Sequence, residues 1–109
     1  MLEALWQSAN TLEALANLAI AQKNTTLFEP IFQNSYLRTA PVVDVCFDDH
    51  QWWLLGWIRA YEATGVVDYL QRAAQIFDYT AEYGWTAQCG GGVIWCPENP
   101  GSPGYKNAV

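Results

Sequence analysis

The segment from Asp48 to Thr64 constrains the fold of this chain more than any other. It reads DDHQWWLLGWIRAYEAT, and its apolar side chains cover almost the whole circumference of a helix: Trp52, Trp53, Leu54, Leu55, Trp57, Ile58 and Tyr61. A helix that is apolar on nearly all sides has to be buried on nearly all sides. The segment therefore predicts an inner helix of an all-α domain.

The residues that follow predict an outer partner for this helix. Gly65 is a typical helix stop, and a helical pattern resumes from Val66 to Tyr83. Its predicted wet stripe holds Asp68, Gln71, Arg72, Gln75, Asp78 and Glu82, and its predicted buried stripe holds Leu70, Ala74, Phe77 and Ala81. A buried helix, a glycine turn and an amphipathic helix make one αα-hairpin, and repeated hairpins of this kind build a two-layered helical ring.

Two further helices are expected before this hairpin. From Leu2 to Gln22 a polar face alternates with an apolar face made of Leu5, Ala9, Leu12, Ala16 and Ala19. A second helix is expected to run from near Glu29 to Leu37, because Pro30 is tolerated only in a first turn. Residues 39–45 predict an extended connection, since proline restricts the residue before it.

The composition changes after Gly84, where glycine and proline become frequent. Such residues predict a long loop, with room for a short hairpin. Tyr105 to Val109 has the pattern of a further helix that begins but is not completed. We therefore expect residues 1–109 to form a single, partial helical domain from a truncated chain.

Charge excludes several classes of partner. Five basic and eleven acidic residues give a net charge of -6, and no cluster of Lys and Arg could neutralise several phosphates, so nucleic acid and anionic membranes are not expected partners. No apolar stretch reaches the length of about 18 residues that spans a bilayer, and no signal peptide is visible. Six Trp and six Tyr residues favour a ligand-binding surface.

The three cysteines do not predict a metal centre. Cys46, Cys89 and Cys96 match no paired C-x-x-C spacing of a zinc site. In an oxidising compartment a disulfide between Cys89 and Cys96 is conceivable, but the sequence does not show whether these two side chains approach each other. We expect no metal and no cofactor.

Asp48 and Asp49 are the strongest candidates for chemistry. Glycoside hydrolysis uses two carboxyl groups, and consecutive residues near a helix start can hold them roughly 5 Å apart, the separation of a retaining mechanism. From spacing alone a structural role is favoured over catalysis, with Asp48 as N-cap and Gln51 completing a capping box. The remaining alternative is a metal site built from Asp44, Asp48, Asp49 and His50. We assign His50 no catalytic role, because an exposed or hydrogen-bonded imidazole is the commoner case.

Aromatic residues divide into two groups. The helical spacing of Trp52, Trp53 and Trp57 favours core packing, with sugar stacking as the alternative. Trp95 and Tyr105 lie in the Gly/Pro-rich stretch, where loops often carry binding groups.

Several blocks in order resemble the core motif of glycoside hydrolase family 76, which contains endo-α-1,6-mannanases and related fungal wall proteins. The blocks span residues 47 to 108: Phe47-Asp48-Asp49, Trp52-Trp53, Arg59-Ala60-Tyr61-Glu62, Thr64-Gly65, Tyr69-Leu70, Ile76-Phe77-Asp78, Gly84-Trp85, Cys89-Gly90-Gly91-Gly92, Ile94-Trp95 and Tyr105-Lys106-Asn107-Ala108. The resemblance implies an (α/α)6 barrel of six helical hairpins, of which this chain supplies an incomplete part.

The resemblance also implies a function. Asp48 would be the nucleophile and Asp49 the general acid/base of a retaining hydrolase that acts on α-1,6-mannan-type polysaccharide. The substrate-binding residues would be Trp53, Trp95, Tyr105, Lys106 and Asn107. An extracellular or cell-wall location is implied as well, and a truncated chain is expected to be poorly active alone.

Two other functions remain open at this point. Stacked αα-hairpins also suit a non-catalytic helical-repeat scaffold, although no second copy of the pattern is found. A carbohydrate-binding remnant would keep the aromatic contacts without the complete cleft.

Overall fold

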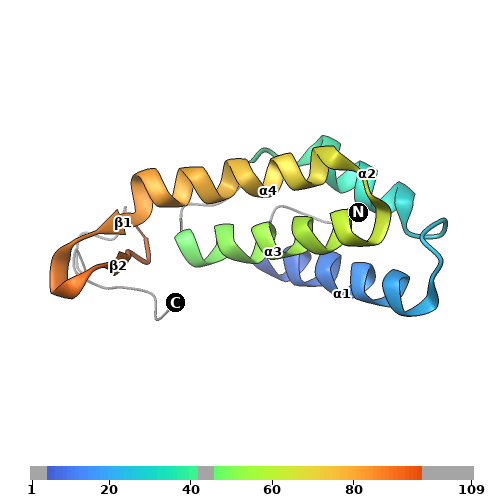
Figure 1. The fold of residues 1–109 in the computed structure, drawn as a ribbon, viewed down its shortest axis with the longest axis horizontal. Helices are drawn as coiled ribbons and strands as arrows, with labels where there is room; N and C mark the ends of the chain where they lie inside the picture. Colours follow the sequence, from blue (N-terminus) through green and yellow to red (C-terminus); the bar gives the residue numbers. More distant parts are fainter. Residues whose placement is uncertain (1–4, 42–45, 97–109) are drawn as a thin grey trace.

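The computed structural model describes residues 5–41 and 46–96. This part of the chain contains α1 (Trp6–Gln22), α2 (Glu29–Arg38), α3 (Phe47–Thr64) and α4 (Val67–Tyr79), followed by β1 (Trp85–Thr86) and β2 (Gly92–Val93). The all-α prediction is confirmed. In Figure 1, α3 runs between α1 and α4, and it contacts both. Within the described residues, no helix combines the length and the hydropathy needed to span a bilayer.

Helix α1 follows the predicted amphipathic pattern and ends where it was expected to end. Its buried residues are Ala9, Leu12, Ala16 and Ala19. Leu5, which the pattern placed on the same face, precedes the first turn and is exposed. Lys23 adopts a left-handed conformation with φ 52° after the last turn, and its N–H group bonds to the carbonyl of Ile20. The predicted start at Leu2 lies outside the described residues.

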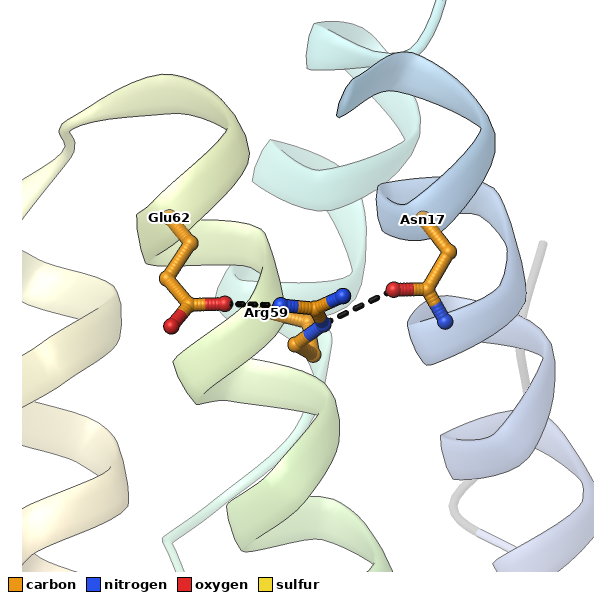
Figure 2. A network of polar contacts seen from close by, with 3 residues as sticks. All are labelled: Asn17, Arg59 and Glu62. Carbon is orange, nitrogen blue, oxygen red and sulfur yellow. Dashed lines mark hydrogen bonds and ion pairs between the residues drawn. The ribbon is translucent and has the colours of Figure 1, made fainter. Parts of the chain in front are cut away.

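Small residues bring α1 and α3 close together. A Cβ atom added to Gly56 would lie 3.1 Å from the carbonyl oxygen of Ala9 and 3.2 Å from Leu12 Cδ2. At the surface of the same interface, Arg59 Nε donates to Asn17 Oδ1 at 2.7 Å and its guanidinium also pairs with Glu62. Figure 2 shows Arg59 reaching from α3 toward α1 with Glu62 on its other side.

Helix α2 begins at the predicted residue. Pro30 occupies its first turn, where the missing N–H group costs no hydrogen bond. Phe32 and Ser35 are buried, and Thr39 ends the helix with extended backbone while its hydroxyl bonds to the carbonyl of Ser35 at 2.7 Å.

The prediction that the Trp-rich helix is buried nearly all round is wrong for the described part of the chain. Trp53 and Trp57 are fully buried, but Trp52 and Leu55 are exposed by 40% and 43%. Helices α1 and α4 cover two sides of α3 and leave a third side open.

Helix α4 packs through a different stripe from the predicted one. The buried residues are Tyr69, Arg72, Ala73 and Ile76, whereas the expected core residues Leu70, Ala74, Phe77 and Ala81 are exposed. Both stripes have helical spacing, so periodicity alone could not choose between them. Arg72 faces inward because its guanidinium donates to the Thr39 carbonyl and lies over the Tyr36 ring.

The exposed apolar residues of α3 and α4 line two neighbouring grooves. A groove of about 350 Å³ is lined by Gln51, Leu54, Leu55, Phe77, Thr80 and Val93. A second, of about 230 Å³, shares Leu54 and Phe77 with it and continues to Ile58 and Leu70. Leu70, Ala74 and Phe77, which the pattern assigned to the core, thus line an apolar surface along one side of the hairpin.

The chain after α4 forms the short hairpin that the sequence allowed. A π-helical turn, Thr80–Gly84, leads into antiparallel β1 and β2, in which Trp85 pairs with Val93 and Thr86 with Gly92. The turn passes tightly over α3, since a Cβ atom on Gly84 would lie 3.0 Å from the Phe47 ring. The residues that follow β2 therefore lie at the amino-terminal end of α3.

Candidate functional site

Asp48 and Asp49 lie in the first turn of α3, but neither is its N-cap. The N-cap is Cys46, which has extended backbone and makes no side-chain capping bond. The predicted capping box of Asp48 and Gln51 is therefore wrong. Instead, the Phe47 N–H group donates to the carbonyl of Trp95 at 2.8 Å, and the Asp49 N–H group donates to Asp48 Oδ1 at 3.0 Å. These contacts satisfy two N–H groups that a helix start leaves without an internal partner.

The two carboxyl groups are close together and half-buried. One carboxylate oxygen of Asp48, one of Asp49 and the sulfur of Cys46 all lie within 4.8 Å of one another. Negative charge at this position is also favoured by the helix dipole. The arrangement can direct two acidic groups at one small ligand.

The same cluster is a poor metal site. The sulfur of Cys46 is bonded to Cys96, so it has no thiolate to offer a metal. His50 is buried and packs edge-on against the rings of Phe47 and Tyr79. Of the two environments expected for its imidazole, exposed or hydrogen-bonded, the exposed one is therefore wrong. Asp44 lies outside the described residues.

The disulfide joins Cys46 to Cys96 across 50 residues of sequence. This pairing excludes the bridge between Cys89 and Cys96 that the sequence left open, because the sulfur of Cys96 is already bonded to Cys46. The Gly-rich segment folds into a hairpin that carries Cys96 back to the start of α3, and a pairing over this distance depends on that tertiary path. Three cysteines alone contain no signal for it.

The predicted binding residues fall into three environments. Trp53 is only 1% exposed and stacks on Trp57 in the core, so no ring face is open to a sugar. Trp95 is 37% exposed, and its Nε1 donates to Asp48 Oδ2 at 3.0 Å. Tyr105, Lys106 and Asn107 lie outside the described residues. Of the predicted set, the structure therefore brings Trp95 to the acidic pair.

A third groove, of about 340 Å³, lies at the other end of α3. It is lined by Glu29, Gln33, Tyr36, Leu37, Thr64, Val66, Asp68 and Tyr69. Burial, followed by the charges of Glu29 and Asp68, raises the pKa of Tyr69. This groove contains no member of the predicted site.

Comparison with known proteins agrees with the sequence motifs. The model of glycosyl hydrolase family 76 matches residues 2–109. No curated protein and no solved structure matches the chain.

Proposed function

Because the chain belongs to glycosyl hydrolase family 76, we propose that it hydrolyses α-1,6-mannan-type polysaccharide with retention of configuration, using Asp48 and Asp49. Family membership supports a glycoside hydrolase and a carbohydrate substrate. The α-1,6 linkage and the retaining mechanism go beyond family membership and are part of the proposal.

The spacing of the two carboxyl groups is the observation that carries the mechanism. Oxygens of Asp48 and Asp49 lie within 4.8 Å of each other at the start of α3. Retaining glycosidases hold their carboxyl groups about 5–5.5 Å apart, whereas inverting enzymes leave about 6.5–9.5 Å for a water molecule. The short separation supports direct attack by one carboxylate on the sugar.

The two residues take different roles in this mechanism. A carboxylate oxygen of Asp48 attacks the anomeric carbon while the bond to the leaving oxygen breaks and Asp49 gives that oxygen its proton. Water then attacks the same carbon, Asp49 takes a proton from the water, and the bond to Asp48 breaks. Both carboxyl groups return to their starting states.

Charge and covalent structure support the substrate and the location. The chain is acidic, with a net charge of -6, which suits a neutral polysaccharide better than a polyanion. The disulfide between Cys46 and Cys96 is typical of secreted proteins. We therefore propose an extracellular or cell-wall location.

The test compares Asp48→Asn and Asp49→Asn with wild type on α-1,6-mannan and on a β-linked mannan. Each variant should lose at least about 100-fold in turnover, because each removes a group that acts in the transition state. Asp78→Asn is the matched control, since Asp78 is exposed on α4, and it should match wild type. Circular dichroism checks that the helices persist.

Two results would redirect the proposal. Release of a product with inverted configuration, seen by proton NMR, would reject the retaining mechanism. Binding of mannan oligosaccharides in calorimetry without turnover on either substrate would reject hydrolysis and favour a carbohydrate-binding protein.

A further inference from the structure

Three contacts attach the residues after β2 to the start of α3. The carbonyl of Trp95 accepts the Phe47 N–H group at 2.8 Å, and the indole of Trp95 donates to Asp48 at 3.0 Å. The next residue, Cys96, is bonded to Cys46. The backbone that follows the indole is therefore held against the helix that carries the acidic pair.

Both oxygens of the Asp48 carboxylate accept hydrogen bonds from N–H groups. Oδ1 accepts the backbone N–H of Asp49, and Oδ2 accepts the indole N–H of Trp95, each at 3.0 Å. One donor belongs to α3 and the other comes from a residue 47 positions later in the chain. Together they determine the rotation of the carboxylate about its own axis.

We propose that Trp95 is a positioning residue, whose indole N–H group holds the Asp48 carboxylate in the orientation from which it attacks the sugar. This inference rests on the proposed function, and it gives Trp95 a role different from that of a stacking platform. A platform uses the face of the ring, whereas the contact seen here uses its N–H group.

The disulfide between Cys46 and Cys96 explains how the exposed hydrogen bond from Trp95 to Asp48 can have a fixed geometry. Trp95 is 37% exposed, and an isolated surface hydrogen bond would exchange readily with water. The Cys46–Cys96 bridge and the Phe47 hydrogen bond leave mainly the side-chain torsions of Trp95 to be ordered. Such pre-organisation of a supporting group keeps a reacting group near its productive geometry.

Trp95→Phe tests the proposal, because phenylalanine keeps an aromatic face and lacks the N–H group. Loss of a hydrogen bond to a charged group predicts a fall in kcat of about 10-fold to 100-fold, with KM changed by less than about 3-fold. Replacing the indole by benzothiophene, which preserves the ring shape without an N–H group, should give the same fall.

Trp85→Phe is the matched control. Trp85 lies in β1 of the same hairpin and is 63% exposed, so its variant should keep the kcat and KM of wild type. If Trp95→Phe also matches wild type, the positioning role is refuted. If Trp95→Phe raises KM and leaves kcat unchanged, the ring is a sugar platform instead.

A measurement without substrate separates this proposal from the glycosidase proposal. In ¹H–¹⁵N NMR spectra, Asp48→Asn should shift the indole N–H resonance of Trp95 and leave that of Trp85 in place. If the wild-type protein turns over no mannan but Asp48→Asn still shifts the Trp95 resonance, the proposed hydrolase activity is rejected. The hydrogen bond between Trp95 and Asp48 is then retained. An unmoved Trp95 resonance would overturn the positioning role even in an active enzyme.

Discussion

Arg72 Nη1 donates a hydrogen bond to the carbonyl oxygen of Thr39 at 2.7 Å, which joins α4 to the residue that ends α2. The guanidinium carbon also lies 4.0 Å from the centre of the Tyr36 ring. Arg72 is only 8% exposed. A carbonyl and an aromatic face thus stabilise a buried cation on the inner side of a helix.

We expect Arg72→Lys to destabilise the fold by about 1–3 kcal/mol, because an ammonium lacks the planar group that both bonds Thr39 and stacks on Tyr36. Urea unfolding followed by circular dichroism measures the change. Arg59→Lys is the control, since Arg59 makes a surface pair with Glu62 and should change stability by less than about 1 kcal/mol. Equal effects of the two substitutions would contradict the role given to Arg72.

Removing the Cys46–Cys96 bridge should cost about 3–5 kcal/mol, because it frees a long loop in the unfolded chain. The double variant Cys46→Ser, Cys96→Ser and the reduced wild type should unfold at similarly lowered urea concentrations. Cys89→Ser is the control and should retain the bridge. Peptide mapping that instead links Cys89 to Cys96 would disprove the pairing.

Trp53→Ala should destabilise the protein by about 3–5 kcal/mol, since it empties a core position stacked on Trp57. Trp52→Ala changes the neighbouring, exposed tryptophan and should cost far less. Urea unfolding compares the two variants. A small effect at Trp53 together with lost sugar binding would assign this residue to the substrate instead of the core.

Alkaline pH should weaken the fold through Tyr69. Burial and the charges of Glu29 and Asp68 raise the pKa of Tyr69 above its ordinary value of 10.0. The folded state therefore holds the hydroxyl proton of Tyr69 more tightly than the unfolded state does. The contribution of this proton to the free energy of unfolding is complete below about pH 10 and is lost as the pH rises through the folded pKa.

Tyr69→Phe should remove the part of the loss of stability at alkaline pH that comes from Tyr69. The free energy of unfolding is measured for both proteins at pH 8 and at pH 11, and the value at pH 8 isolates any packing change. A parallel loss of stability in the variant and in wild type would show that Tyr69 is not responsible.

Local pattern predicted the helices well because their signals lie within a few residues. The stop at Gly65 needs only a residue that tolerates φ 72°, and the start of α2 needs only a proline suited to a first turn. The proximity of Asp48 and Asp49 at the start of α3 could also be predicted from the sequence, since consecutive residues share one turn.

The burial of α4 shows where local pattern failed. Leu70 and Phe77 are more apolar than Arg72, yet Arg72 faces inward. Its ring partner, Tyr36, lies in α2, and its carbonyl partner, Thr39, is the C-cap of that helix. Both lie more than 30 residues earlier in the chain, so no periodicity within α4 contains them.

The sequence by itself determined the helical hairpin, the positions of Asp48 and Asp49 and membership of the family, because each depends on neighbouring residues or on ordered motifs. Only the tertiary structure decided that Cys46 pairs with Cys96, that Trp53 is core and that Trp95 donates to Asp48. The disulfide and the Trp95 contact depend on the path of the β1–β2 hairpin, which returns distant residues to the start of α3. Trp53 is buried because the helices pack around it in a shared core.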